Sequence, residues 1–372
     1  MSDKAKSGLW ARRDVLRTAA GLAGGLAMAP FGRVLGAASA GGVIEAANIS
    51  AVGTKVGGAS MKKPGPYRIG FSNGFSGNSW RAMCLASLKA EAAKHDDIED
   101  LIIFDGQGDI TKQVNDIQTL MSQQVDAILC IANSGTAVRP VLRQATRSGI
   151  VTVPFNLPVE GEDWSTYVGT DPENKGKKLG QWLKQALNGS GKIVGLGGLP
   201  GNSYTASAWK GTKEVLKDSD VEILAFKDAY WEEDRAKVVM ADLIAAYPEI
   251  DGIWCDGGQD AAGAVKALIS ANRDLVPVTG DDYNGLLKLY HNEHKSHPKF
   301  EFASLSEPTW ESVVALRAAL SLLRGDTVPK RQIIHPQLIT KDNYTDYMRA
   351  DMPDGVFVDT NLSNDQLQKI FS

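Results

Sequence analysis

The chain has 372 residues, with 40 Lys and Arg against 44 Asp and Glu, so its formal net charge at pH 7 is −4. A chain of this length exceeds one comfortable hydrophobic core, and we therefore expect two domains. Because there is no basic excess, the composition argues against nucleic acid and anionic membrane surfaces as partners.

The first 40 residues have the pattern of a removable export signal. Arg12 and Arg13 precede a weakly apolar stretch rich in Gly and Ala, which ends in the small residues at 38–40. Paired arginines before such a weak core resemble a twin-arginine signal, which exports folded proteins. Glycines and Pro30 interrupt the run too early for a membrane anchor, which needs about 20 apolar residues. The segment carries six basic and two acidic residues, so its removal changes the formal net charge from −4 to −8.

After this segment the sequence predicts a flexible leader and then alternating strands and helices. Residues 41–66 are rich in Gly, Ala, Ser and Lys without periodicity, which is typical of a leader. The fold is expected to start near Tyr67, with strands at 69–71, 101–104, 125–131 and 150–155 and helical patterns between them. The run VDAILCI is almost continuously apolar, as expected of a parallel strand that helices cover on both faces.

The same alternation restarts near residue 170. Asp171 is expected to cap a helix that has Pro172 at its first position. Further strands are predicted at 193–196, 221–225, 253–255 and 276–279, each followed by a helical pattern. The chain therefore predicts an α/β fold of two similar halves, each a doubly wound parallel sheet.

Polar and aromatic residues follow these strands with unusual regularity. In open α/β sheets ligands bind beyond the carboxyl ends of the strands. Carboxylates, amides and an arginine can hydrogen-bond hydroxyl groups, and flat rings can stack on the apolar face of a sugar. A single Asn or Asp there is ordinarily a turn former or a helix cap, but the recurrence beside three tryptophans favours a binding site. The expected ligand-binding residues are Asn73, Asn78, Trp80, Arg81, Asp105, Asn133, Asn156, Asn202, Trp231, Asp256, Asp282, Glu307 and Trp310.

From about Tyr67 to Leu362 the chain resembles type I periplasmic sugar-binding proteins of the ribose/galactose-binding family, which serve ABC transporters. The resemblance is carried by the order and spacing of GNSWRAM, FDGQGDITKQVNDIQTLMSQQVDAILCIANS, SGIVTVPFN, WCDGGQDAAGAVKAL and VPVTGDDYNG. It implies two Rossmann-like lobes that close on a ligand and are joined by a hinge of three segments. The implied crossings put 67–170 plus 308–336 in the N-terminal lobe and 171–307 plus 337–372 in the C-terminal lobe.

The same resemblance implies roles for four residues. Trp80 matches an aromatic residue that stacks on the sugar, and Trp231 matches one that faces it from the other lobe. Asp282 and Glu307 match positions that bind sugar hydroxyls.

The chain also departs from the family pattern at several of these positions. Asn156 and Leu157 stand where many members have an Asp-Arg pair, and Gly257 stands at a position that is often asparagine. No arginine is present around 206 and 208, where the family often has a ligand-binding one. These departures argue against a ribose-type ligand, and Arg81 is expected to replace a lost arginine from the opposite side.

The sequence therefore predicts a periplasmic substrate-binding protein without catalysis, cofactor or metal. It would bind a small neutral sugar or polyol between two closing lobes and deliver it to the membrane permease of an ABC importer. A chemoreceptor is a second candidate partner, no nucleic acid is expected, and we expect a monomer.

Two other protein classes were weighed against this function. The segment GLGGLPG places Gly195, Gly197 and Gly201 after a predicted strand, with Asp228 downstream, which resembles a dinucleotide-binding turn. The glycine spacing differs from that motif and lies in the middle of the chain, so an exported NAD(P)-dependent oxidoreductase is kept as the alternative. A repressor of the lactose type would need an N-terminal helix-turn-helix in place of the export signal.

Neither the histidines nor the cysteines indicate a site. The segment HNEHKSH spaces His291, His294 and His297 by three, lacks the i, i+4 pair of a helical zinc site, and is expected to be a solvated loop. The three cysteines lie far apart, at 84, 130 and 255, and are expected to be buried and unpaired.

Overall fold

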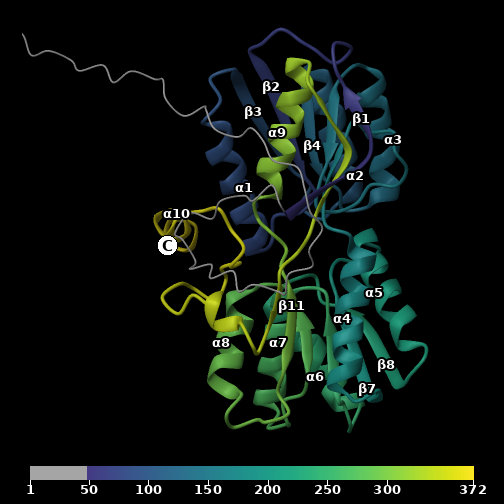
Figure 1. Ribbon diagram of the computed structural model, residues 1–372, viewed down its shortest axis with the longest axis vertical. Helices are drawn as coiled ribbons and strands as arrows, with labels where there is room; N and C mark the ends of the chain where they lie inside the picture. The colour runs from purple at the N-terminus through teal and green to yellow at the C-terminus, as the bar shows by residue number, and fades with distance from the viewer. Residues whose placement is uncertain (1–47) are drawn as a thin grey trace, which may run out of the picture. The chain divides into compact units, whose positions relative to one another are not determined.

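Three sheets organise residues 48–372, the part of the chain that the computed structural model describes (Figure 1). A four-stranded parallel sheet has the order β3-β2-β4-β5, with β2 at Tyr67–Asn73, β3 at Ile98–Asp105, β4 at Ala127–Ile131 and β5 at Val151–Pro154. A six-stranded sheet has the order β13-β11-β10-β9-β7-β8, comprising β7 (Ser190–Gly197), β8 (Asp220–Asp228), β9 (Gly252–Cys255), β10 (Val278–Gly280), β11 (Phe302–Leu305) and β13 (Leu338–Thr340). Its strands are parallel except at the edge, where β13 runs antiparallel to β11.

Helices cover both faces of each sheet. The four-stranded sheet packs against α1 (Ser79–Ala92), α2 (Ile110–Ser122), α3 (Gly135–Arg147) and α9 (Glu311–Arg324). The six-stranded sheet packs against α4 (Pro172–Ala186), α5 (Ser203–Leu216), α6 (Glu233–Ala246), α7 (Gly258–Ser270) and α8 (Asn284–Glu293). The expected α/β fold class with doubly wound parallel sheets is thus confirmed. No helix among the described residues is both long and apolar enough to cross a membrane.

A third, smaller sheet lies where the chain passes between the two larger ones. Its order is β1-β12-β6, with β1 at Ile49–Gly57, β6 at Tyr167–Gly169 and β12 at Thr327–Ile334. Strand β6 leads from the four-stranded sheet into α4, and β12 leads from α9 into β13. The expected crossings near Thr170, Glu307 and Pro336 fall between these elements.

Strand β1 corrects one expectation from the sequence. The composition of 41–66 predicts a flexible leader, but residues 49–57 pair antiparallel with β12, with Ile49 opposite Ile334 and Gly57 opposite Thr327. Two glycines with positive φ, Gly53 and Gly57, and a register shift inside the pairing break the period-two pattern that marks a strand. The expected signal segment over 1–40 lies outside the described residues.

The C-terminal segment contacts elements of both large sheets. Backbone pairing holds its first part to the six-stranded side, where Val358 donates to the carbonyl of Asp282 at 3.1 Å. Beyond it, Ser87 of α1 donates to Asn361 at 2.8 Å, and α10 (Asn364–Phe371) packs against α1. The segment that we assigned to the C-terminal lobe therefore contacts both lobes.

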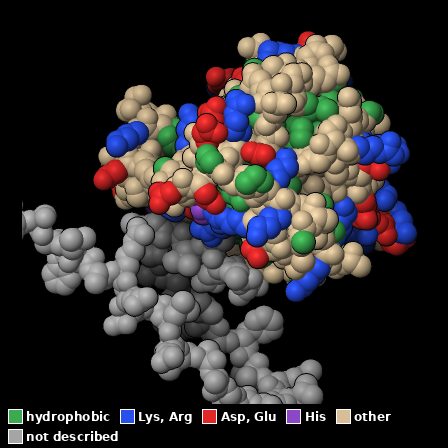
Figure 2. Space-filling model, turned by 90° about the horizontal axis from the view of Figure 1, so that it is seen from above, with side chains coloured by type: hydrophobic (Ala, Val, Ile, Leu, Met, Phe, Trp, Pro, Cys, Tyr) green, Lys and Arg blue, Asp and Glu red, His purple; other side chains and the backbone are tan. Residues whose placement is uncertain are grey.

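Local sequence features explain several element boundaries. Asp171 caps α4 by accepting from the backbone N–H of Asn174, and Pro172 occupies the first helical turn, as the sequence predicts. The three cysteines are buried and unpaired, which confirms that expectation. On the face seen in Figure 2, acidic and basic side chains of the described residues are interspersed.

Candidate functional site

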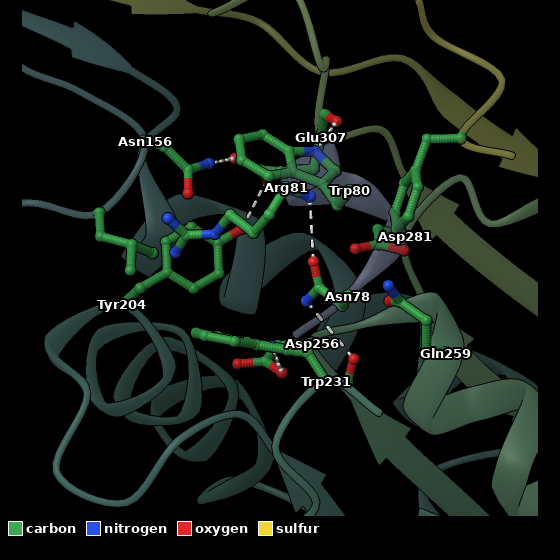
Figure 3. A pocket seen from close by; sticks show the side chains of 12 residues that line it. Asn78, Trp80, Arg81, Asn156, Tyr204, Trp231, Asp256, Gln259, Asp281 and Glu307 are labelled. Atoms are coloured by element: carbon green, nitrogen blue, oxygen red, sulfur yellow. Dashed lines mark hydrogen bonds between the residues drawn. The ribbon is translucent and has the colours of Figure 1, made fainter. Parts of the chain in front are cut away.

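A cavity of about 40 Å³ lies between the carboxyl-end turns of the two large sheets (Figure 3). Residues from both lobes, from the hinge and from the C-terminal segment line it: Asn78, Trp80, Arg81, Asn156, Leu157, Tyr204, Trp231, Asp256, Gln259, Asp281, Glu307 and Phe357. This is where an open α/β sheet presents its ligand site.

Two indole rings face the cavity from opposite sides (Figure 3). Trp80, the second residue of α1, donates its Nε1–H to the backbone carbonyl of Glu307 at 2.7 Å. Trp231 donates its Nε1–H to Oδ1 of Asp256 at 3.0 Å. Tyr204 meets Trp231 edge-on, with ring centroids 6.3 Å apart. These hydrogen bonds fix the rings, so each can offer a flat apolar face to a ligand.

Glycines make room for the Trp231 ring. A Cβ atom at Gly198 would lie 2.2 Å from the indole, and a Cβ at Gly257 would lie 2.6 Å from it. Trp231 itself has φ of 55°, a left-handed conformation that turns its side chain back over the sheet edge. The indole therefore packs directly against the backbone of two glycines. A larger residue at either glycine would displace the indole.

Arg81 brings a buried positive charge to the cavity. Asn78 caps α1 by accepting from the backbone N–H of Arg81 at 3.0 Å, and Arg81 Nη1 donates to Oδ1 of Asn73 at 2.8 Å. The guanidinium carbon lies 5.6 Å from the centroid of the Trp80 ring. Burial lowers the pKa of Arg81 to about 10, so the side chain is still charged at neutral pH. It can donate hydrogen bonds to ligand oxygens.

Glu307 is held by four side-chain donors of the protein. Its Oε1 accepts from Asn156 at 3.0 Å and from Thr170 at 3.2 Å. Its Oε2 accepts from Lys175 at 2.9 Å and from Tyr204 at 2.6 Å. Because these donors come from both lobes and the hinge, the carboxylate is positioned to hold the site together.

The C-terminal lobe contributes two acidic side chains with fewer partners. Asp256 accepts from Trp231 through Oδ1, while its buried Oδ2 has no hydrogen-bond partner among the described residues. Asp281 accepts from the backbone N–H of Gly258 at 2.6 Å. Burial raises the pKa of Asp256 to about 6 and raises that of Asp281 well above its ordinary value. This wall is rich in hydrogen-bond acceptors for hydroxyl groups.

The structure brings together seven of the thirteen residues expected from the sequence. The seven that line the cavity are Asn78, Trp80, Arg81, Asn156, Trp231, Asp256 and Glu307. Contact of these residues with a ligand stays a prediction.

The other six expected residues do not line the cavity, and most of them support it or the hinge. Asn73 holds Arg81, and Asn202 Nδ2 donates to the carbonyl of Asn133 at 3.2 Å, a contact between the lobes. Asp282 accepts from the backbone N–H groups of Glu307 at 2.8 Å and of residue 359 at 2.7 Å.

The remaining two, Asp105 and Trp310, make hydrogen bonds that involve no cavity-lining residue. Asp105 accepts from the backbone N–H of Gln107 at 2.9 Å, and Trp310 donates to Asp359 at 2.8 Å.

Five lining residues were not among those expected: Leu157, Tyr204, Gln259, Asp281 and Phe357. Leu157 and Asp281 lie in strand-end turns, so the rule that selected their neighbours also covers them. Tyr204 and Gln259 are the second residues of α5 and α7, the same position that Trp80 holds in α1. Phe357 follows no strand of the large sheets, and nothing in the sequence places it here.

The two other motifs have structural explanations. In β7, a Cβ at Gly195 would lie 2.7 Å from Phe226 and one at Gly197 would lie 2.5 Å from Thr205, so these glycines accommodate packed side chains. His291 lies in α8 rather than in a loop, and its Nδ1 is 3.1 Å from the hydroxyl of Tyr344. The loop expectation is therefore wrong at this histidine. No cluster of His, Cys, Asp and Glu suited to a metal is found within residues 48–372.

Known proteins resemble this chain in sequence and in fold. A family model described as a periplasmic binding protein domain matches residues 69–327. A xylitol-binding protein of Mycolicibacterium smegmatis is 32% identical over 255 residues, which is 68% of this chain and 71% of the relative. A ribose import binding protein of Bacillus subtilis is 24% identical over 71% of this chain and 84% of the relative.

A solved structure shares the fold. The ABC transporter solute-binding protein of Bacillus halodurans, solved with bound myo-inositol, superposes with a TM-score of 0.69 at 23% identity, covering 77% of this chain and 98% of that protein. The family match spans most of the chain and agrees with two lobes that share one cavity. The chain belongs to the periplasmic binding protein family.

Proposed function

We propose that this protein is the periplasmic substrate-binding protein of an ABC importer and that it binds a small neutral sugar or polyol between its lobes. The observation that carries this function is one cavity with an indole from each lobe and polar groups that can hydrogen-bond hydroxyls. The relatives named for xylitol and ribose support a ligand of this size and chemistry.

The charges at the cavity favour a neutral ligand. Asp256, Asp281 and Glu307 line it, whereas Arg81 is the one basic side chain among its lining residues. Glu307 is already paired with Lys175, whereas Asp256, with a pKa of about 6, faces the ligand as a carboxylate at neutral pH. A ligand carboxylate would be repelled by it.

The family supports delivery to a permease and a periplasmic location, and the other partner is proposed in addition. The bound ligand is delivered to the membrane permease of the importer, and a chemoreceptor is a second candidate partner. Export by the twin-arginine route, action as a monomer and a binding role without catalysis are parts of the same proposal.

A thermal-shift screen tests the function. Pentoses, hexoses, alditols and inositols are added singly to the purified protein, because a ligand that binds only the folded state raises the melting temperature by mass action. We expect a neutral sugar or polyol to raise it, and Trp80→Ala to remove most of the shift. Nicotinamide absorbance in the purified protein, together with no stabilisation by any polyhydroxy compound, would favour the exported oxidoreductase instead.

A further inference from the structure

We propose that Gln259 is a specificity-determining residue, whose carboxamide recognises one hydroxyl group of the ligand. The inference rests on the proposed function, because it concerns which groups of the same cavity select the ligand. It is carried by a buried carboxamide that lines the cavity and has no partner for its N–H groups.

The backbone at Gly257 leaves no room for a side-chain amide. A Cβ at Gly257 would collide with the indole of Trp231, which already fills the space beside the backbone. The side-chain amide that would otherwise start from 257 is therefore missing. Gln259 lies two residues further along, and Figure 3 shows its carboxamide directed toward the part of the cavity near Asn78 and Asp281.

The free N–H groups distinguish Gln259 from the other carboxamides of the cavity. Asn156 Nδ2 donates to Glu307 at 3.0 Å, and Asn78 Nδ2 donates weakly to the carbonyl of Trp231 at 3.5 Å. Gln259 is 4% exposed, and its Nε2 has no acceptor among residues 48–372. A buried amide without an acceptor destabilises a folded protein, because it has lost its hydrogen bonds to water without gaining another. A ligand oxygen that accepts from Nε2 would remove this cost.

A free acceptor accompanies this free donor. Oδ2 of Asp256, at the end of β9, is buried without a partner, while Oδ1 is held by Trp231. A hydroxyl group can accept from one neighbour and donate to another, whereas a methylene can do neither and a carboxylate can only accept. The cavity therefore offers ligand hydroxyls both a donor, from Gln259, and an acceptor, from Asp256. A ligand without the hydroxyl that accepts from Nε2 would leave the carboxamide of Gln259 unpaired.

The test compares two identical substitutions at buried, unpartnered glutamine amides. Gln259→Met keeps the length of the side chain but removes its hydrogen bonds. Gln332→Met, in β12, is the matched control, because Gln332 Nε2 is also buried without a partner but does not line the cavity. Binding is measured by calorimetry with xylitol, ribitol, D-ribose and myo-inositol, and then with the monodeoxy analogues of whichever compound wild type binds most tightly.

We expect Gln259→Met to weaken binding of the full ligand about tenfold to a hundredfold and Gln332→Met to change it less than twofold. Wild type should reject one monodeoxy analogue strongly, and Gln259→Met should lose that discrimination. Without ligand, the melting temperature of Gln259→Met should equal or exceed that of wild type, because an unpaired buried amide has been removed. A purely structural role would lower it.

The outcomes separate the inference from the function on which it rests. If wild type binds none of the four probes, both proposals are overturned. Suppose that wild type binds a probe, but Gln259→Met binds it with wild-type affinity or still rejects the same monodeoxy analogue. The role of Gln259 is then overturned and the function stands. A lower melting temperature of ligand-free Gln259→Met, with unchanged discrimination, also overturns it.

Discussion

The ammonium group of Lys175 lies 2.9 Å from Oε2 of Glu307, and the exposed fractions of the two side chains are 1% and 7%. Lys175 lies in the first turn of α4, whereas Glu307 follows β11. The ion pair therefore joins two chain segments near the hinge. Burial by itself would lower the pKa of Lys175, but the attraction of Glu307 and Asp281 raises it above its ordinary value. Lys175 is therefore charged at neutral pH although it is almost completely buried, and Glu307 is its side-chain partner.

Removing one partner should be much more harmful than removing both. Lys175→Met leaves the Glu307 carboxylate buried without its cation and should lower the free energy of unfolding by about 3–5 kcal/mol. The double variant Lys175→Met/Glu307→Gln should recover a large part of that loss. Urea denaturation measures both.

An exposed ion pair on the same helix is the control. Lys177, which is 39% exposed, lies 3.1 Å from Glu173. Lys177→Met should change the free energy of unfolding by less than about 1 kcal/mol, because exposed pairs are screened by water and salt. Equal effects of Lys175→Met and Lys177→Met would show that burial of the first pair has no energetic consequence.

Stability should decrease as the pH rises from about 4 to about 7. Burial, with the neighbouring charge of Asp359, raises the pKa of Asp282 to about 7, and burial raises that of Asp256 to about 6. Unfolded aspartates titrate near 3.9, so within this window the folded state binds more protons than the unfolded state. The free energy of unfolding therefore falls with rising pH. Urea midpoints measured through the window check the sign.

Substitution of one carboxylate tests the source of this slope. Asp282→Asn cannot titrate and should give a flatter profile, even though the loss of an acceptor lowers its overall stability. Asp97→Asn is the control, because the hydrogen bond from Arg324 lowers the pKa of Asp97. Asp97 therefore contributes to the pH dependence of stability only below this pH range. If the free energy of unfolding of Asp282→Asn changes with pH as steeply as that of wild type, Asp282 is not the source of the pH dependence.

The order of strands and helices could be read from the sequence because alternation and apolar runs are local properties. Strand β4, the AILCI part of VDAILCI, is buried at every position, as a parallel strand covered on both faces must be. Strand β1 could not be found in this way. Its partner β12 lies far away in sequence, and the glycines and the register shift remove the alternation that a search relies on.

The sequence predicted which turns surround the cavity, because these turns follow strands. It did not predict which of two adjacent residues in a turn lines the cavity. Asp281 and Asp282 follow the same strand, and the sequence selected Asp282, which holds two backbone N–H groups. Successive residues of an extended segment point in opposite directions, so adjacent aspartates face different surroundings. Phe357 reaches the cavity through tertiary pairing of the C-terminal segment with Tyr283, which no local pattern reveals.

An acidic ligand should bind less tightly than its neutral parent. Asp256 lines the cavity and, with a pKa of about 6, is still ionised at neutral pH, while Arg81 is the one basic side chain among the lining residues. We expect an alditol to bind at least about tenfold more tightly than the corresponding aldonate, measured by calorimetry at neutral pH. Asp256→Asn, which keeps an acceptor for Trp231, should narrow the gap. Tighter binding of the aldonate would contradict the charge argument.

Ligand binding should favour a closed form in which the lobes touch. The hydroxyl of Ser203 donates to the carbonyl of Pro158 at 3.0 Å, a contact between the lobes that does not involve a cavity-lining residue. Ser203→Ala should weaken ligand binding about twofold to tenfold, because it removes a hydrogen bond of the closed form alone. Small-angle scattering should show compaction on adding ligand. An unchanged radius of gyration at saturation would exclude closure.

Trp80 and Arg81 should provide a stacking surface and a charged donor for the ligand. Trp80 is 5% exposed and is fixed by its hydrogen bond to the carbonyl of Glu307, while Arg81 is fixed by Asn73. Loss of the indole face should remove about 1–3 kcal/mol of contact, so Trp80→Ala should weaken binding about tenfold to a hundredfold. Arg81→Ala should have an effect of similar size, because a buried ligand oxygen loses its charged donor. Trp182→Ala, a half-buried tryptophan outside the cavity, is the control and should leave affinity unchanged. Wild-type affinity in both cavity variants by calorimetry would place the ligand elsewhere.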